Sequence, residues 1–195
     1  MNIIGISGGL TQSSRTSILV REILSQLHVK FPFSSIHFVP LAGVARELGG
    51  VLWRSEVLPS IEQQLQAIEL ADVIVLACPV YRASYPGLFK HFLDFVERKG
   101  FEKKVVLLAA CGGSQHHSLI IEQQLRPLVS GLGAFSVPTG IYTEAKDYAQ
   151  DSLINPSVLA RIESATDEAV HLLRLSDKKV HSLDVVPQPQ AVSSL

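Results

Sequence analysis

Short apolar runs alternate along the chain with longer segments of helical periodicity. Residues 2–7 form a short apolar run, and residues 71–77 and 104–110 are nearly continuous aliphatic stretches. Nearly continuous stretches of this kind are typical of parallel strands buried on both faces. Residues 35–41 are less continuously apolar, and residues 134–142 form a last, shorter run. The pattern therefore predicts five strands.

Helices are predicted between these strands and after the last one. Apolar residues recur at three- and four-residue spacing in each of these segments, which is the period of a helix with one buried face. Pro156 suits the first turn of the last helix, and residues 42–59 show no regular period. The predicted helices begin at about Arg15 and just after Ser60, span 86–98 and 117–132, and run from 156 to about 175.

This alternation predicts an α/β domain with a doubly wound parallel sheet. Five strands with five helices favour the flavodoxin-like strand order over the longer, six-stranded dinucleotide-binding order. We therefore predict a flavodoxin-like three-layer fold with a five-stranded parallel sheet over residues 1–175. Residues 176–195 contain Pro187-Gln188-Pro189-Gln190 and little periodicity, so they are predicted to form a flexible C-terminal tail.

Composition narrows the class of protein further. With 195 residues, 47% hydrophobic and 18% charged, the chain can bury one sizeable core. A net charge of −1 gives no reason to expect nucleic acid as a partner. We find no signal peptide and no apolar run near the roughly 20 residues that span a bilayer, and we expect no membrane association and a cytoplasmic location. Cys78 and Cys111 are too few for a disulfide framework, so we expect both to be structural.

The loop after the first strand combines two glycines with several hydroxyl side chains and Arg15. Glycines let the backbone approach a ligand closely, and the free N–H groups at the start of the next helix favour an anion. Arg15 adds a fixed charge and several donors. The loop therefore fits a phosphate, although a Ser/Thr helix cap beside an exposed arginine would explain the same residues. It contains neither a Walker motif nor GxGxxG.

The loop after residues 71–77 reads CPVYRASYPG from Cys78 to Gly87. Two tyrosines and an arginine, on a loop closed by Pro86 and Gly87, suit a flat aromatic ligand with backbone amides at its edge. A surface loop with two half-buried tyrosines is the alternative interpretation.

The loop after residues 104–110 again pairs two glycines, Gly112 and Gly113. The adjacent His116 and His117 would point about 100° apart on a helix, and no cysteine or carboxylate stands at a ligand-like spacing, so we expect no metal site. Ligands of open parallel sheets bind beyond the carboxyl ends of the strands, where the strand order reverses. The three loops should therefore form one site.

At these three loops the chain resembles the NAD(P)H-dependent FMN reductases. It is most similar to their sulfonate-assimilation branch, the reductase components of alkanesulfonate and methanesulfonate monooxygenases. The resemblance covers about residues 1–175, and PVYRASYPG is its most specific part. It rests on Ser14-Arg15-Thr16, on Pro79 to Gly87, and on Gly112-Gly113-Ser114 followed by Leu125-Arg126-Pro127-Leu128.

The resemblance implies an oxidoreductase that transfers hydride from NAD(P)H to FMN and supplies reduced flavin to a transient monooxygenase partner. It also implies a homodimer or homotetramer. Hydride transfer needs no acid–base side chain, and we accordingly find no catalytic motif. By this resemblance Ser14, Arg15 and Thr16 would hold the FMN phosphate with Ser7 and Gly9 nearby, and Pro79, Val80, Tyr81, Arg82, Ala83 and Ser84 would face Gly112, Gly113, Ser114 and Gln115 across the flavin ring.

The chain departs from these relatives at Gln123. The alkanesulfonate-type reductases carry an inserted aromatic residue there, which is linked to a π-type turn at their tetramer interface, whereas residues 118–125 contain no aromatic residue. Two alternatives to a flavin-releasing reductase stay open. One is an FMN-bound quinone or azo reductase that retains its flavin, and the other is a non-enzymatic FMN-binding electron-transfer protein. The sequence does not distinguish NADH from NADPH as the donor.

Overall fold

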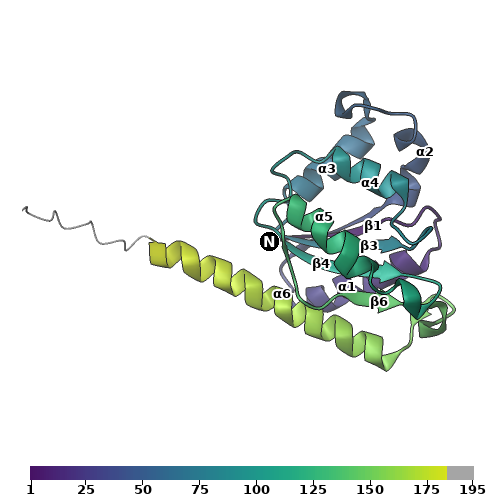
Figure 1. Cartoon of the computed structure of the whole chain (residues 1–195). Coiled ribbons are helices and arrows are strands. Elements are labelled where there is room, and N and C mark those ends of the chain that lie inside the picture. The colour runs from purple at the N-terminus through teal and green to yellow at the C-terminus, as the bar shows by residue number, and fades with distance from the viewer. Residues whose placement is uncertain (184–195) are drawn as a thin grey trace, which may run out of the picture.

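The computed structural model describes residues 1–183, with side chains described through residue 175. A parallel sheet lies between two layers of helices (Figure 1), in the strand order β2-β1-β3-β4-β5. This is the flavodoxin-like order, with its reversal between β1 and β3, so the predicted fold class is confirmed. The strands are β1 (Asn2–Ser7), β2 (Ser35–Pro40), β3 (Val73–Pro79), β4 (Val105–Cys111) and β5 (Phe135–Ser136), and the main helices are α1 (Arg15–Lys30), α3 (Pro59–Glu69), α4 (Gly87–Asp94), α5 (Arg126–Gly131) and α6 (Pro156–Leu183).

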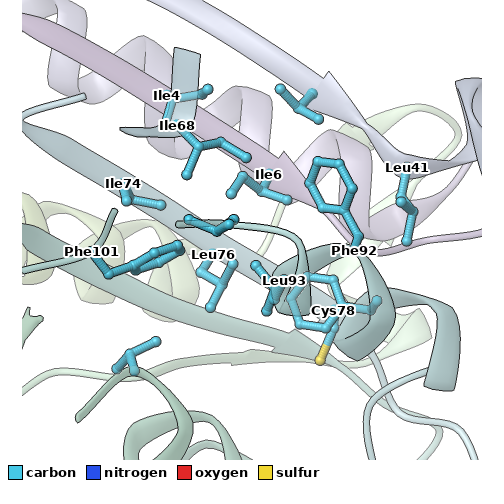
Figure 2. Close-up of a cluster of buried hydrophobic side chains, with 14 of the residues drawn as sticks. Ile4, Ile6, Leu41, Ile68, Ile74, Leu76, Cys78, Phe92, Leu93 and Phe101 are labelled. Carbon is cyan, nitrogen blue, oxygen red and sulfur yellow. The ribbon is translucent and has the colours of Figure 1, made fainter. Parts of the chain in front are cut away.

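The two faces of β3 show why the sheet is buried on both sides. Ile74, Leu76 and Cys78 belong to the core beneath α3, α4 and α5, whereas Val73 and Val75 belong to the core beneath α1 and α6. Figure 2 shows the first of these cores, in which Cys78 and its neighbours on β3 lie among residues of α4. Burial raises the pKa of the Cys78 thiol. These properties fit the structural role expected for Cys78.

The predicted strand over residues 134–142 is in fact two short strands. β5 pairs with the beginning of β4, and β6 (Ile141–Thr143) pairs with its end. Pro138 lies between them, and proline has no N–H to donate to a ladder. The interruption is held by side chains instead: Arg126 Nη1 donates to Val137 O at 2.7 Å, and Arg161 Nε donates to Gly140 O.

The predicted helix over residues 117–132 is also irregular. A 3₁₀ turn, η3 (Gln115–His117), is followed by a π-helical turn, η4 (Ile121–Leu125), and only then by α5. At the end of η4, the backbone N–H of Arg126 donates a hydrogen bond to Ile121 O, five residues earlier in the chain. The π turn is therefore present although no aromatic residue stands at Gln123.

The irregular segment before α3 contains only short helices, η1 (Leu41–Gly43), α2 (Ala45–Leu48) and η2 (Arg54–Glu56). Two helix ends differ from the prediction. α4 ends at Asp94 rather than near residue 98, and α6 continues to Leu183, so the predicted helix end near Leu175 is wrong. The rest of the predicted tail, 184–195, lies outside the described residues. Among the helices of residues 1–183, none is long and apolar enough to cross a membrane.

Arg54 in η2 joins three elements through its guanidinium group. It forms a bidentate pair with Glu62 of α3, at 3.0 Å for Nε and 2.8 Å for Nη2, and it also contacts Glu69. Its Nη1 donates to Phe95 O at 3.1 Å, at the point where α4 ends. The Arg54 hydrogen bond is the main cause that lowers the pKa of Glu62 below its ordinary value of 4.5. This cluster therefore fixes the irregular segment against α3 and α4.

We expect Arg54→Leu to lower the free energy of unfolding by about 2 kcal/mol at pH 7, because it leaves two partly buried carboxylates without their cation. The lowered pKa of Glu62 means that this stabilisation is complete above pH 4.5 and is lost as the pH falls through the folded-state pKa. Urea unfolding of both proteins from pH 7 to pH 3 measures this, and the two stabilities should converge in acid. Arg46→Leu, at an exposed position of α2, is the matched control. An equal difference at every pH would contradict the assignment.

Candidate functional site

The three predicted loops meet at the carboxyl edge of the sheet. They surround a cavity of about 290 Å³ beside the reversal point between β1 and β3. This is the position at which flavodoxin-like folds bind their ligands. The cavity is lined by Gly9, Thr11, Ser13, Ser14, Arg15, Thr16, Pro79, Val80, Tyr81, Cys111, Gly112, Gly113 and Glu144.

The first loop contributes the amino terminus of α1. The Ser14 hydroxyl caps this helix by accepting from Ser17 N at 3.1 Å. The first N–H groups of a helix have no acceptor within it, and both Arg15 and Thr16 line the cavity. The helix dipole and the exposed Arg15 side chain together make this wall positive and suitable for an anion.

Two of the predicted hydroxyl contacts are used inside the protein. Ser7 is fully buried and shares a hydrogen bond of 3.0 Å with the Ser17 hydroxyl. Ser14 bonds the same hydroxyl at 3.0 Å. Ser7 therefore supports the loop from beneath and does not line the cavity. Ser14 has both roles that the sequence suggested, because it caps α1 and also lines the cavity.

Gly9 is required by this cap. A Cβ at this position would lie 2.7 Å from the Ser14 Oγ, which is too close for any real contact. The glycine thus lets the loop backbone pass directly over the helix cap. Its backbone becomes part of the cavity wall as a result.

The second loop forms a tight turn above the cavity. Pro79, Val80 and Tyr81 line the cavity, and Val80 N donates to Cys111 O at 2.8 Å, which ties this loop to the third one. Beyond them the chain reverses between Tyr81 and Ser84, whose backbones exchange hydrogen bonds of 2.7 and 3.0 Å. Arg82, Ala83 and Ser84, which were also predicted to contact the ligand, do not line the cavity.

The third loop is held by β6. Gly112 N donates to Thr143 O at 2.9 Å, and the Tyr142 hydroxyl donates to Ser114 O at 2.6 Å. Burial, followed by the nearby Glu144, raises the pKa of Tyr142, so the hydroxyl stays a donor at neutral pH. Gly112 and Gly113 line the cavity as predicted, whereas Ser114 and Gln115 lie outside it.

Four residues of the cavity wall were not among the predicted contacts: Thr11, Ser13 and Cys111, which lie in the predicted loops, and Glu144, which lies outside them. Glu144 matters most chemically. Its side chain is 13% exposed, and its Oε1 is buried with no hydrogen-bond partner in the described part of the protein. It follows β6 directly, so only correct placement of that short strand would have revealed it.

Tyr148, another missed residue, connects the third loop to the first. Its hydroxyl lies 2.9 Å from Thr143 Oγ1 and 3.3 Å from Arg15 O. Burial is the main cause that raises its pKa, followed by the nearby Cys111. The neutral hydroxyl therefore joins the end of β6 to the start of α1, which fixes two walls of the cavity relative to each other.

A larger cavity of about 560 Å³ lies at the other end of the sheet. Met1 and Asp72, which precede β1 and β3, line it together with the ion-paired Lys30 and Asp167. It lies at the amino ends of the strands, where ligands of this fold class do not bind. Within residues 1–175, no three His, Cys, Asp or Glu side chains gather as a metal site would require.

Fold and site together define a flavodoxin-like, ligand-binding α/β protein. The profile of the NADPH-dependent FMN reductase family matches residues 1–149, and the chain belongs to this family. It is 41% identical over 172 residues to the NADH-dependent FMN reductase SfnF of Pseudomonas fluorescens, covering 88% of this chain and 91% of that one. It is 40% identical over 176 residues to the NADH-dependent FMN reductase SfnE of Pseudomonas putida, covering 88% and 92%. An oxidoreductase structure from Corynebacterium diphtheriae superposes with a TM-score of 0.77 at 28% identity, over 89% of this chain and 97% of that one.

The family assignment confirms the predicted enzyme class, an NAD(P)H-dependent FMN reductase, and its cofactors FMN and NAD(P)H. The residues of the cavity fit FMN. A helix amino terminus and an arginine suit its phosphate, and the glycine backbone of the third loop suits the close approach of a flat ring. The Glu144 Oε1, which has no partner among the described residues, is available to accept a hydrogen bond from a hydroxyl or N–H group.

Proposed function

We propose that this chain reduces FMN with NADH and releases the reduced flavin to a flavin-dependent monooxygenase of the sulfonate-assimilation type. The cavity at the carboxyl edge carries the proposal, because its walls are the three loops in which the resemblance lies. The NADH-dependent FMN reductases SfnF and SfnE support NADH as the preferred donor.

In the proposed site the chain binds and orients FMN, which supplies the hydride acceptor when bound. Arg15 and the amino terminus of α1 neutralise the phosphate. Val80 and Tyr81 form one side of the ring site and Gly112 and Gly113 the other. No side chain is assigned to proton transfer.

The nicotinamide donor is proposed to bind over the face of the flavin that the loops leave open. The sequence offers no GxGxxG cradle for a dinucleotide. Tyr81 lines the cavity and is 45% exposed, so its side chain is available to a second ligand. A nicotinamide donor held only over the open face of the flavin dissociates easily. Such weak binding suits an enzyme in which the donor must leave before the next ligand occupies the same place.

Steady-state oxidation of NADH and NADPH with FMN, FAD or riboflavin tests this function. We expect consumption of NADH in the presence of FMN, with a higher kcat/KM for NADH than for NADPH. No consumption of either nucleotide would leave the non-enzymatic electron-transfer protein as the surviving alternative.

Rapid filtration tests the release of flavin. The protein is reduced anaerobically with NADH and passed through a membrane that retains the chain, and reduced FMN should appear in the filtrate. Flavin that stays bound through turnover, with reduction of an added quinone or azo dye, would replace the proposal with the flavin-retaining alternative.

The predicted assembly and location stay predictions. The homodimer or homotetramer rests on the family resemblance, and light scattering after size-exclusion chromatography measures it. The cytoplasmic location rests on the sequence alone. The division into a domain of residues 1–175 and a tail of 176–195 also came from the sequence, and α6 crosses that boundary and continues to Leu183.

A further inference from the structure

The turn of the second loop holds two residues in a left-handed conformation. Arg82 and Ala83 have φ angles of 51° and 65°, and the turn is closed by the hydrogen bonds between Tyr81 and Ser84. Side chains with a Cβ adopt this region at a cost of about 1 kcal/mol or more for each residue. Neither residue is a glycine, so the turn requires support from outside itself.

That support comes from Gln124 of the π turn η4. Its Nε2 donates to Ala83 O at 2.9 Å, and its Oε1 accepts from the Ser84 hydroxyl. Both polar ends of one amide thus hold two successive residues of the turn, 40 and 41 positions away in the sequence. The neighbouring Gln123 is exposed and has no side-chain hydrogen bond to the residues that the structure describes.

The π geometry explains how a polar residue reaches this place. In a regular α-helix, Gln124 would follow Ile120 and Ile121 at four- and three-residue spacing and would share their core-facing side. Both isoleucines are buried, as is Leu125. The wider turn moves Gln124 away from that apolar side, and its half-buried amide meets the second loop instead.

We propose that Gln124 is a positioning residue for FMN. It acts through the turn: by holding Ala83 and Ser84, it keeps Tyr81 and Val80 where they line the cavity. The inference rests on the proposed flavin site, and it adds a specific role for η4, a segment that does not itself line the cavity.

The test uses Gln124→Met, which keeps the length of the side chain and removes both hydrogen bonds. We expect the Kd and KM for FMN to rise about tenfold, since two hydrogen bonds of ordinary net strength are lost. The kcat at saturating FMN should stay within about twofold, because the substitution changes no group that takes part in hydride transfer once FMN is bound. Gln124→Glu, which accepts from Ser84 but cannot donate to Ala83, should show a smaller rise of the same kind.

Gln123→Met is the matched control on the same π turn, and its FMN affinity should equal that of the unsubstituted chain. Fluorescence titration with FMN gives Kd without turnover, and the visible absorption of the bound flavin reports its surroundings. If Gln124→Met binds FMN as tightly as Gln123→Met, the inference is wrong. It is also wrong if both variants lose affinity equally. If the unsubstituted chain itself does not bind FMN, the proposed function fails first, and the titration of that chain shows it separately.

Discussion

Replacing Arg15 with alanine is expected to weaken FMN binding by about 10- to 100-fold. Arg15 lies in the cavity wall at the amino terminus of α1, and its side chain is exposed. A charge-assisted hydrogen bond to a phosphate is worth about 1.5–3 kcal/mol. Because Arg15 is the exposed first residue of α1 and the helix is capped by Ser14, replacing its side chain should leave the stability of the fold almost unchanged.

Riboflavin provides the sharpest control for this prediction, since it has the flavin ring and no phosphate. Arg15→Ala should bind riboflavin as the unsubstituted chain does, whereas FMN affinity falls. Arg15→Lys keeps the charge without the planar donor fork, and it should recover part of the loss. An unchanged Kd for FMN would remove Arg15 from the phosphate site. Equal losses for both ligands would place it against the ring instead.

The central strands were predictable because their burial leaves a simple pattern. β1, β3 and β4 are buried on both faces, and their aliphatic runs appear in the sequence within two residues of the observed bounds. The edge was not predictable in the same way. Pro138 breaks the last strand, and long-range bonds from Arg126 and Arg161 replace the missing ladder. Sequence patterns carry no signal for such contacts.

The π turn shows a second limit of periodicity. Ile121, Leu125 and Val129 recur every four residues and are all buried, which a regular helix would explain equally well. The extra backbone residue per turn is visible only in the hydrogen bonds. The family resemblance linked such a turn to an aromatic residue near Gln123, yet here the turn exists without it. The turn therefore does not depend on that aromatic side chain in this protein.

The site was predictable as a set of loops and less so as a set of contacts. The rule that ligands bind at the carboxyl ends of parallel strands brought the three loops together correctly. It does not say which way each side chain faces. Ser7 is hydrogen-bonded to Ser17 beneath the loop, and Glu144 directly follows β6, a strand that the pattern had merged with β5. Both differences depend on tertiary packing.

Replacing Gly112 with alanine is expected to disrupt the third loop. A Cβ there would lie 2.7 Å from the Tyr142 Cζ and closer still to its hydroxyl oxygen, so the bond from this hydroxyl to Ser114 O must break. Overpacking against a ring held by the core costs about 1–3 kcal/mol, occasionally more. We expect a loss of stability of about 3 kcal/mol, and FMN reduction should fall at least tenfold because this wall of the cavity moves.

Gly113 is the matched position in the same loop, because a Cβ there meets no atom within 4 Å. Gly113→Ala should therefore unfold like the unsubstituted chain, to within about 0.5 kcal/mol. Gly113 nevertheless lines the cavity, so the added methyl group should raise the Kd for FMN by occupying ring space. Urea unfolding and flavin titration of both variants separate the two effects. If Gly113→Ala alters neither quantity, the third loop is not a wall of the flavin site, and the steric requirement at Gly112 then belongs to the fold alone.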